Sequence, residues 1–161
     1  MPVFTTPRPA CPADYPAICR LVQSPRELFF VYPSGRWPFT VAQLEDLAQV
    51  RRDLTVLDLD GTVAAFANLY DLEPGRHAFI GNVVVAPGLR GRGLGRRLME
   101  YMLSRVFVHH GLAEARLSVF SHNVPALLLY VDLGFVPYAA EVRRDHDYRE
   151  VVLLHMRREA G

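Results

Sequence analysis

Glycine and arginine crowd one short stretch of the chain, "RGRGLG", from Arg90 to Gly95. Because glycine has no Cβ atom, such a stretch leaves its backbone N–H groups open to a ligand. Arginine adds a full positive charge and a forked set of donors that suits phosphate oxygens. Apolar residues recur at helical spacing from Leu94, and a helix that begins there would add the positive end of its dipole. The stretch therefore predicts a site for a phosphate-bearing ligand.

Two common phosphate-binding loops do not match this stretch. A P-loop ends on Gly-Lys-Ser/Thr, and the sequence contains no lysine. The dinucleotide fingerprint G-x-G-x-x-G would need its third glycine where Arg96 stands, and no early strand–helix–strand unit precedes it. The pattern that fits is R-x-x-G-x-G over Arg90–Gly95, directly after the apolar run "VVVAP". The alternative is a plain turn with solvated arginines, which gives no reason for three closely spaced glycines.

A second constellation lies in "SHNVPALLLYVDLGF", from Ser121 to Phe135. Asn123 and Tyr130 are seven residues apart, close to two helical turns, so they share one face of a predicted helix. A phenol hydrogen-bonded to a leaving group can donate its proton as a general acid. Taken alone, Tyr130 would be a core tyrosine with its hydroxyl at the surface, and Asn123 would be a helix cap. Their occurrence together with the upstream glycine stretch favours a catalytic role for Tyr130.

The two constellations together resemble the acyl-CoA signature of the GCN5-related N-acetyltransferases, the GNAT family. The shared features are R-x-x-G-x-G after V-x-V-x-P, and the later series of Asn, Ala, Tyr and Leu-Gly-Phe. The resemblance implies an enzyme that uses acetyl-CoA and no metal. Its acetyl group would pass directly, in a ternary complex, to a primary amine of a small molecule, amino acid or peptide.

The resemblance also implies roles for individual residues. The pyrophosphate of coenzyme A would bind the glycine stretch, and the pantetheine arm would lie along Val83–Val85, between two strands that splay apart. Tyr130 would protonate the leaving thiolate as the catalytic acid, and a backbone N–H of Val83–Val85 would stabilise the oxyanion. The coenzyme-binding residues implied in this way are Val83, Val84, Val85, Arg90, Gly91, Arg92, Gly93, Leu94, Gly95, Arg96, Asn123, Ala126 and Tyr130.

The sequence leaves open which group removes the proton from the acceptor amine. Ribosomal-protein acetyltransferases of this family carry a glutamate five residues before the asparagine, and Ser118 stands there in this chain. The alternatives are Asp71, Glu73, His122 or a chain of water molecules; an imidazole titrates near neutral pH and suits this role. The missing glutamate also leaves open a non-catalytic acyl-CoA sensor, although such a binder would not need a thiol-facing tyrosine.

The resemblance places the acceptor pocket between the first helices and the middle strands of the sheet. The segment "ELFFVYPSGRWPFT" in that region is aromatic and broken by prolines. Aromatic walls can hold an amino-acid side chain or a cationic amine. Phe29 and Phe30 are expected to belong to the core instead. The predicted substrate-binding residues are Tyr32, Trp37, Tyr70 and Asn82.

Apolar periodicity and turn residues predict a mixed α/β fold. The order of elements indicates a mixed sheet with helices on both faces, and the resemblance implies that it is mostly antiparallel and twisted, with six to seven strands and about four helices, and splayed at the acyl-CoA site. Within one helix, Leu44, Leu47 and Val50 are expected to face the core. The expected strands are 3–7, 54–59, 62–72, 78–85, 115–120, 135–144 and 148–156, and the expected helices are 12–23, 40–50, 94–110 and 123–133.

Composition limits the class of protein. A length of 161 residues suits one domain, residues 1–161, and half of the residues are hydrophobic. The net charge of +1 argues against a nucleic-acid binder. Cys11 and Cys19 show no zinc-type spacing and no disulfide framework. Without a signal peptide or a run of ~18 apolar residues, the chain is expected to be cytoplasmic and away from membranes. The resemblance adds a homodimer as an expectation.

Overall fold

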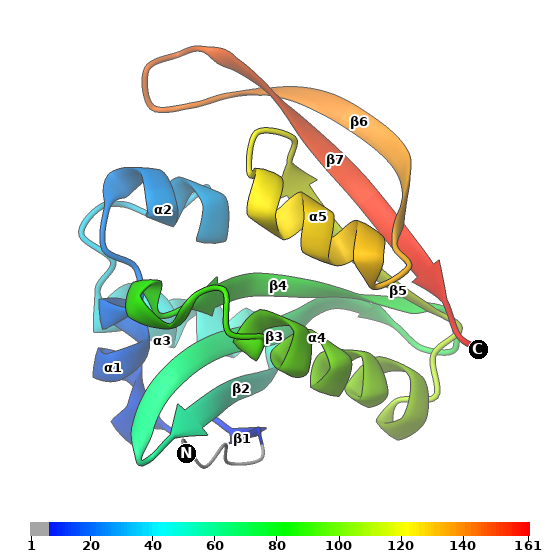
Figure 1. Ribbon diagram of the computed structural model, residues 1–161, viewed down its shortest axis with the longest axis horizontal. Helices are drawn as coiled ribbons and strands as arrows, with labels where there is room; N and C mark the ends of the chain where they lie inside the picture. The colour runs from blue at the N-terminus through cyan, green and yellow to red at the C-terminus, as the bar shows by residue number, and fades with distance from the viewer. Residues whose placement is uncertain (1–6) are drawn as a thin grey trace.

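A seven-stranded sheet forms the centre of the computed structural model, which describes residues 7–161 (Figure 1). The strand order is β1-β2-β3-β4-β5-β7-β6, and neighbours run antiparallel except β4 and β5, which are parallel. The mixed α/β fold expected from the sequence is therefore confirmed. The strands are β1 (Arg8–Pro9), β2 (Arg52–Leu59), β3 (Thr62–Glu73), β4 (His77–Val85), β5 (Glu114–Phe120), β6 (Val136–Arg144) and β7 (Glu150–Glu159). The α-helices are α1 (Tyr15–Arg20), α2 (Pro25–Val31), α3 (Val41–Val50), α4 (Leu94–Ser104) and α5 (Val124–Asp132).

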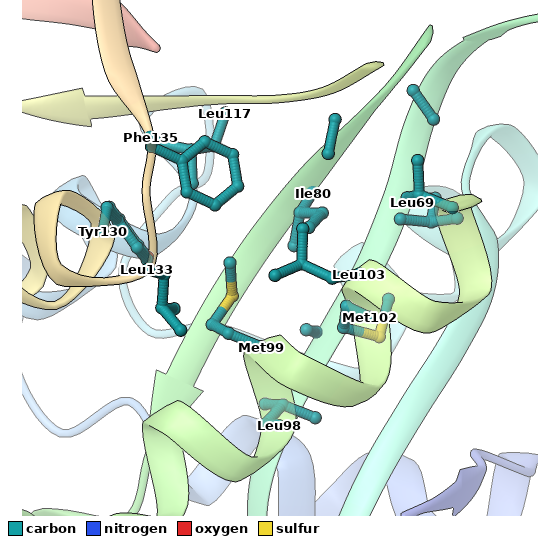
Figure 2. Close-up of a cluster of buried hydrophobic side chains, with 14 of the residues drawn as sticks. Leu69, Ile80, Leu98, Met99, Met102, Leu103, Leu117, Tyr130, Leu133 and Phe135 are labelled. Atoms are coloured by element: carbon teal, nitrogen blue, oxygen red, sulfur yellow. The ribbon is translucent and has the colours of Figure 1, made fainter. Parts of the chain in front are cut away.

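Helices cover both faces of the sheet, and each face has its own hydrophobic core beneath the helices. On one face α4 crosses β3 and β4, and its residues Leu98, Met99 and Met102 pack toward Leu69 and Ile80 (Figure 2). These α4 residues recur three and four positions apart, so one stripe of the helix is apolar. The core of the opposite face includes Ile18 and Leu21 near α1, Leu44 and Leu47 of α3, Val56 of β2 and Phe66 of β3.

β4 and β5 pair only where they begin. Their parallel ladder joins residues 77–79 to residues 114–116, and no further ladder pair links them within residues 7–161. β5 instead continues along its other edge in an antiparallel ladder with β7. The β6–β7 hairpin and α5 therefore diverge from β4 (Figure 1). This divergence opens the sheet at its centre.

A β-bulge interrupts β4 beside this opening. β4 carries one extra residue at Asn82, where one residue of β3, Ala67, opposes two of β4, Asn82 and Val83. Asn82 has a φ of +52°, and asparagine tolerates the left-handed region better than most residues. Its side chain accepts a hydrogen bond from Asn68 Nδ2 and donates one to the Val31 carbonyl, each 2.8 Å long. The bulge changes which face each residue meets: Ile80 packs under α4, whereas Val84 packs with α1 and α3.

The remaining elements follow the sequence-based expectations with a few differences. The segment 24–39, expected to be irregular or only briefly helical, contains the short helix α2, which Ser24 Oγ caps by accepting a hydrogen bond from Glu27 N at 3.1 Å. The core placement of Val50 is wrong: it is 74% exposed. Val50 lies six residues after Leu44, about 120° away around the helix axis. The expected helix 94–110 is α-helical only to Ser104 and continues as a π-helix over 105–109.

The first and last strands can also be compared with the expectation. Residues 3–6 of the expected first strand lie outside the described part of the chain. Within the described residues, the first strand is β1. The expected hairpin of the last two strands is confirmed, and all nine residues of β6 are exposed. None of the helices in residues 7–161 combines the length and the apolar character that a membrane crossing requires.

The side chain of Asp53 in β2 interacts with the segment that follows α4. Its Oδ2 accepts a hydrogen bond from Arg105 Nε at 2.9 Å and lies 2.8 Å from His110 Nε2. Burial raises the pKa of Asp53, but these two partners outweigh it and the net pKa is lowered. A carboxyl whose pKa is lowered in the folded state stabilises the fold at pH values above its pKa in the unfolded chain. This contribution to stability is lost as the pH falls through its pKa in the folded protein.

Asp53→Asn is therefore expected to lower the free energy of unfolding by about 2 kcal/mol at neutral pH. The loss should shrink as the pH falls below about 4, where the unfolded chain begins to take up this proton, and disappear below the lower pKa of the folded protein. Urea unfolding at pH 7 and at about pH 2.5 measures both values. Asp46→Asn, on the exposed side of α3, is the matched control and should change neither. An equal loss at both pH values would contradict the electrostatic role.

Candidate active site

A cleft of about 1060 Å³ occupies the opening between β4 and β5. The glycine stretch, α5 and the bulged strand β4 line it, together with residues of α2, β3, β5, β6 and β7. This volume lies at the upper end of the range for small-molecule sites. The cleft therefore suits a long ligand that passes through the sheet, or two ligands that meet end to end.

The glycine stretch forms the turn that leads into α4. Gly91 and Gly93 have φ values of +77° and +81°, in the left-handed region that favours glycine. Gly93 is the N-cap residue of α4, and no side chain caps the first turn. The backbone N–H groups of this first turn of α4 are thus available to an anion in the cleft. A Cβ atom on Gly95 would come within 3.3 Å of Leu129 Cδ2, so α4 and α5 pack closely at this point.

Two arginines of this turn connect it to neighbouring helices. Arg90 donates from Nε to the Val85 carbonyl at 3.2 Å, and its Nη2 pairs with Glu27 of α2 at 2.8 Å. Arg96 pairs with Asp132 of α5. The positive charge of the turn is therefore held in place by α2 on one side and by α5 on the other.

Tyr130 projects from α5 into the wall of the cleft, next to Leu133 (Figure 2). It is 7% exposed, and its ring meets Phe135 edge-on at 6.2 Å. Burial raises the pKa of Tyr130, so the phenol keeps its proton near neutral pH and acts as a donor. Asn123 also lines the cleft, but the expectation that it caps α5 is wrong. Its ψ of 73° is not that of an extended N-cap residue, and its side chain makes no capping hydrogen bond.

Polar side chains of three other strands form a connected series that reaches the cleft. Ser118 of β5 and His155 of β7 are direct neighbours in the ladder, with Oγ and Nδ1 2.7 Å apart. His155 Nε2 lies 3.4 Å from Glu141 Oε1 of β6. When Nε2 carries the ring proton and faces this carboxylate, Nδ1 accepts from the serine hydroxyl. Burial raises the pKa of Tyr70, and a hydrogen bond with Ser118 opposes this shift.

Sequence reasoning did not identify His155. The one signal available was a polar residue inside the apolar run of the last strand, "VVLLHM". Ser118, Tyr70 and His155 all line the cleft. The position that holds a glutamate in the ribosomal-protein enzymes thus holds a serine backed by a histidine in this chain.

The structure brings most of the predicted site residues to this one cleft. Of the predicted coenzyme-binding set, Arg92 alone does not line it and is exposed. Tyr32, Tyr70 and Asn82 line the end where the acceptor was expected. Trp37 lies outside the cleft and is 44% exposed. The lining residues from the predicted coenzyme set are Val83, Val84, Val85, Arg90, Gly91, Gly93, Leu94, Gly95, Arg96, Asn123, Ala126 and Tyr130.

The residues considered as the base are separated by the fold. Asp71 lines the cleft, whereas Glu73 and His122 lie outside it. Glu73 pairs with Arg76 at 2.8 Å in the turn between β3 and β4. His122 packs edge-on against Phe30, with the ring centres 5.0 Å apart. Among residues 7–161, no group of three or more His, Cys, Asp or Glu side chains is placed to hold a metal ion.

Solved structures that share this fold include N-acetyltransferases. A candidate phosphinothricin N-acetyltransferase is 23% identical, with 99% of each chain covered and a TM-score of 0.83. Spermidine N-acetyltransferase from Vibrio cholerae, in complex with CoA and spermine, is 21% identical, with 96% of this chain and 94% of that chain covered and a TM-score of 0.80. Ribosomal-protein-alanine N-acetyltransferase from Brucella melitensis is 17% identical, with 97% of this chain and 100% of that chain covered and a TM-score of 0.77.

These structures establish the fold of the chain, and a match to a family model establishes the family to which the chain belongs. The model described as the Acetyltransferase (GNAT) family matches residues 18–135, which is most of the chain. The protein is therefore a member of the GNAT family of acetyl-CoA-dependent acyltransferases.

Proposed function

We propose that this protein transfers the acetyl group of acetyl-CoA directly to the primary amine of a small acceptor in a ternary complex. One observation supports the proposal above others: a single cleft joins the glycine stretch, Tyr130 and the Ser118–His155 pair. Donor and acceptor can then meet without an intermediate carrier on the protein.

The donor end of the cleft fits coenzyme A on two counts. Beyond Phe79, the edge of β4 that faces β5 has no ladder partner in the described chain, so backbone groups of Val83–Val85 are available to the amides of pantetheine. The left-handed Gly91 and Gly93 open the backbone before α4 to the pyrophosphate. When bound, acetyl-CoA supplies an acetyl group activated as a thioester.

The chain's own residues would then divide the proton transfers between the two ends of the cleft. Ser118 Oγ takes the proton of the acceptor amine as its own hydroxyl proton passes to His155 Nδ1, and the Glu141 carboxylate stabilises the positive charge that results on the imidazole. A backbone N–H of Val83–Val85 stabilises negative charge that develops on the acyl oxygen. Tyr130 donates its proton to the departing sulfur.

Release of free coenzyme A tests this function directly. A thiol-reactive chromophore follows the release from acetyl-CoA against a panel of amines, amino acids and short peptides. We expect release that depends on the amine, with mass spectrometry showing one added acetyl group on the acceptor. Acetyl-CoA binding by calorimetry, with only slow hydrolysis that no amine accelerates, would instead support a non-catalytic sensor.

Gly93→Ala tests the role of the glycine turn. A Cβ atom disfavours the left-handed φ by about 1–2 kcal/mol, so the turn before α4 should shift. We expect acetyl-CoA to bind about tenfold more weakly by calorimetry, since about 1.4 kcal/mol corresponds to tenfold in affinity. Gly88→Ala is the matched control, because Gly88 lies in the same loop without a positive φ or any atom within 4 Å of a new Cβ. Equal binding by both variants would contradict this role.

A further inference from the structure

Among the arginines that line the cleft, Arg51 is the one that forms no ion pair within the described residues. Each of the other arginines that line the cleft has at least one carboxylate partner in the described chain. These pairs are Arg90 with Glu27, Arg96 with Asp132, Arg143 with Glu141, and Arg144 with Glu150. Arg51 forms no such ion pair within residues 7–161; Asp71, which lines the same cleft, acts on it electrostatically without forming one.

The surroundings of Arg51 make this missing partner costly. Its guanidinium stacks over the Tyr70 ring, 4.0 Å from the ring centre. Nη1 is buried and has no hydrogen-bond partner among the described residues. Burial lowers the pKa of Arg51, which means that the charged form is partly stripped of water. A desolvated charge without a counter-ion destabilises a fold, and an anionic ligand would remove that penalty.

The position of Arg51 links this charge to the proposed chemistry. A Cβ atom on Gly81 would lie 2.8 Å from Arg51 Nη1, so the guanidinium sits over the β4 backbone next to the bulge. Val83, the first of the residues whose backbone is assigned to the acyl oxygen, follows Gly81 by two positions along β4. Tyr70 contacts Arg51 with its ring and hydrogen-bonds to Ser118 with its hydroxyl. One small molecule can therefore reach Arg51 and Ser118 together.

We infer that the acceptor is a free α-amino acid, whose carboxylate pairs with Arg51 while its amine faces Ser118. This inference rests on the proposed function and narrows it to one substrate class. Polyamines offer no anion for Arg51. The N-terminal residue of a peptide offers a neutral amide where a free amino acid has its carboxylate. The unpaired arginine therefore selects free amino acids over both.

Matched pairs of α-amino acids and their α-amides test this inference, because each pair differs only in the charged group. For the best acceptor, wild-type kcat/KM should favour the acid over the amide by about 10- to 100-fold, the value of a charge-assisted hydrogen bond. Arg51→Met should abolish this preference through a higher KM for the acid and leave the amide nearly unchanged. Calorimetry with protein saturated by coenzyme A should show the same loss of amino-acid binding without any turnover.

Two controls separate binding from folding. Arg51→Met removes an unpaired buried charge, so its Tm should be equal to or above that of the wild type. Arg52→Met changes the next residue, an exposed arginine that does not line the cleft, and should keep the full preference for the acid. A lower Tm for Arg51→Met, with equal losses for acid and amide, would assign Arg51 a structural role.

The outcomes also distinguish this inference from the proposed function. Turnover of amides, peptides or polyamines as fast as amino acids would overturn the amino-acid inference and leave the acetyltransferase intact. The absence of turnover with every amine would overturn the proposed function. In that case the calorimetric comparison still decides whether Arg51 binds a carboxylate.

Discussion

Tyr130→Phe is expected to lower kcat by about 100- to 1,000-fold, within the range for loss of a general acid. The phenylalanine keeps the ring that packs against Phe135 and removes only the hydroxyl. Since burial holds the proton on the Tyr130 phenol, the wild-type side chain is a donor across the working pH range. Acetyl-CoA affinity should stay within about threefold, because most of the proposed contacts to the coenzyme come from the backbone and the glycine turn. Stopped-flow release of thiol and calorimetry measure the two effects separately.

Tyr101→Phe provides the matched control for this loss. Tyr101 lies on α4 outside the cleft, so its kcat should equal that of the wild type. Thermal unfolding should show both variants folded, with Tm values within a few degrees. If Tyr130→Phe kept more than a tenth of the wild-type kcat, another group or water would have to protonate the sulfur.

His155→Gln should produce the second large effect, a loss of about 100-fold in kcat/KM at neutral pH. Glutamine retains a polar side chain in the strand but cannot accept the proton that Ser118 passes on. The loss should shrink as the pH rises, because a growing fraction of the acceptor amine is then neutral without help from a base. A pH profile of kcat/KM from 6 to 10 measures this change. Ser118→Ala should show the same trend, since it removes the link between amine and imidazole.

The exposed His109, beside the end of α4, offers a control of the same chemistry. His109→Gln should leave both the rate and its pH profile unchanged, because the side chain is exposed and does not line the cleft. A loss in His155→Gln that stayed constant across the pH range would mean that His155 positions Ser118 or the strand. The proton would then leave through water.

The parts of the site that could be predicted are those set by neighbours in sequence. The left-handed turn at Gly91 and Gly93 needs glycine locally, and the helix that follows is encoded by its own periodicity. Asn123 and Tyr130 share a helix face for the same reason. Their common cleft could be anticipated because the motif resembles a known family, since no local rule states that β4 and β5 separate.

The acceptor end depends on contacts between distant segments, so little of it could be predicted from the order of residues. Ser118 and His155 are 37 residues apart and meet only through the register of β5 with β7. Arg51 ends the turn before β2, yet its guanidinium lies over β4 because of how three strands are aligned. Trp37 shows the opposite error: an aromatic residue near prolines suggested a pocket wall, and the chain leaves it at the surface.

A sheet that divides at its centre has four edges instead of two. The two inner edges belong to β4 beyond Phe79 and to β5 beyond Arg116, and both carry main-chain donors and acceptors. A ligand with amide groups in a row, such as pantetheine, can pair with such an edge in the way a further strand would. Recognition of this kind depends on backbone position and hardly on side-chain identity. A donor site of this kind would tolerate divergence of the sequence, and the fold itself is shared with structures that are only 17–23% identical to this chain.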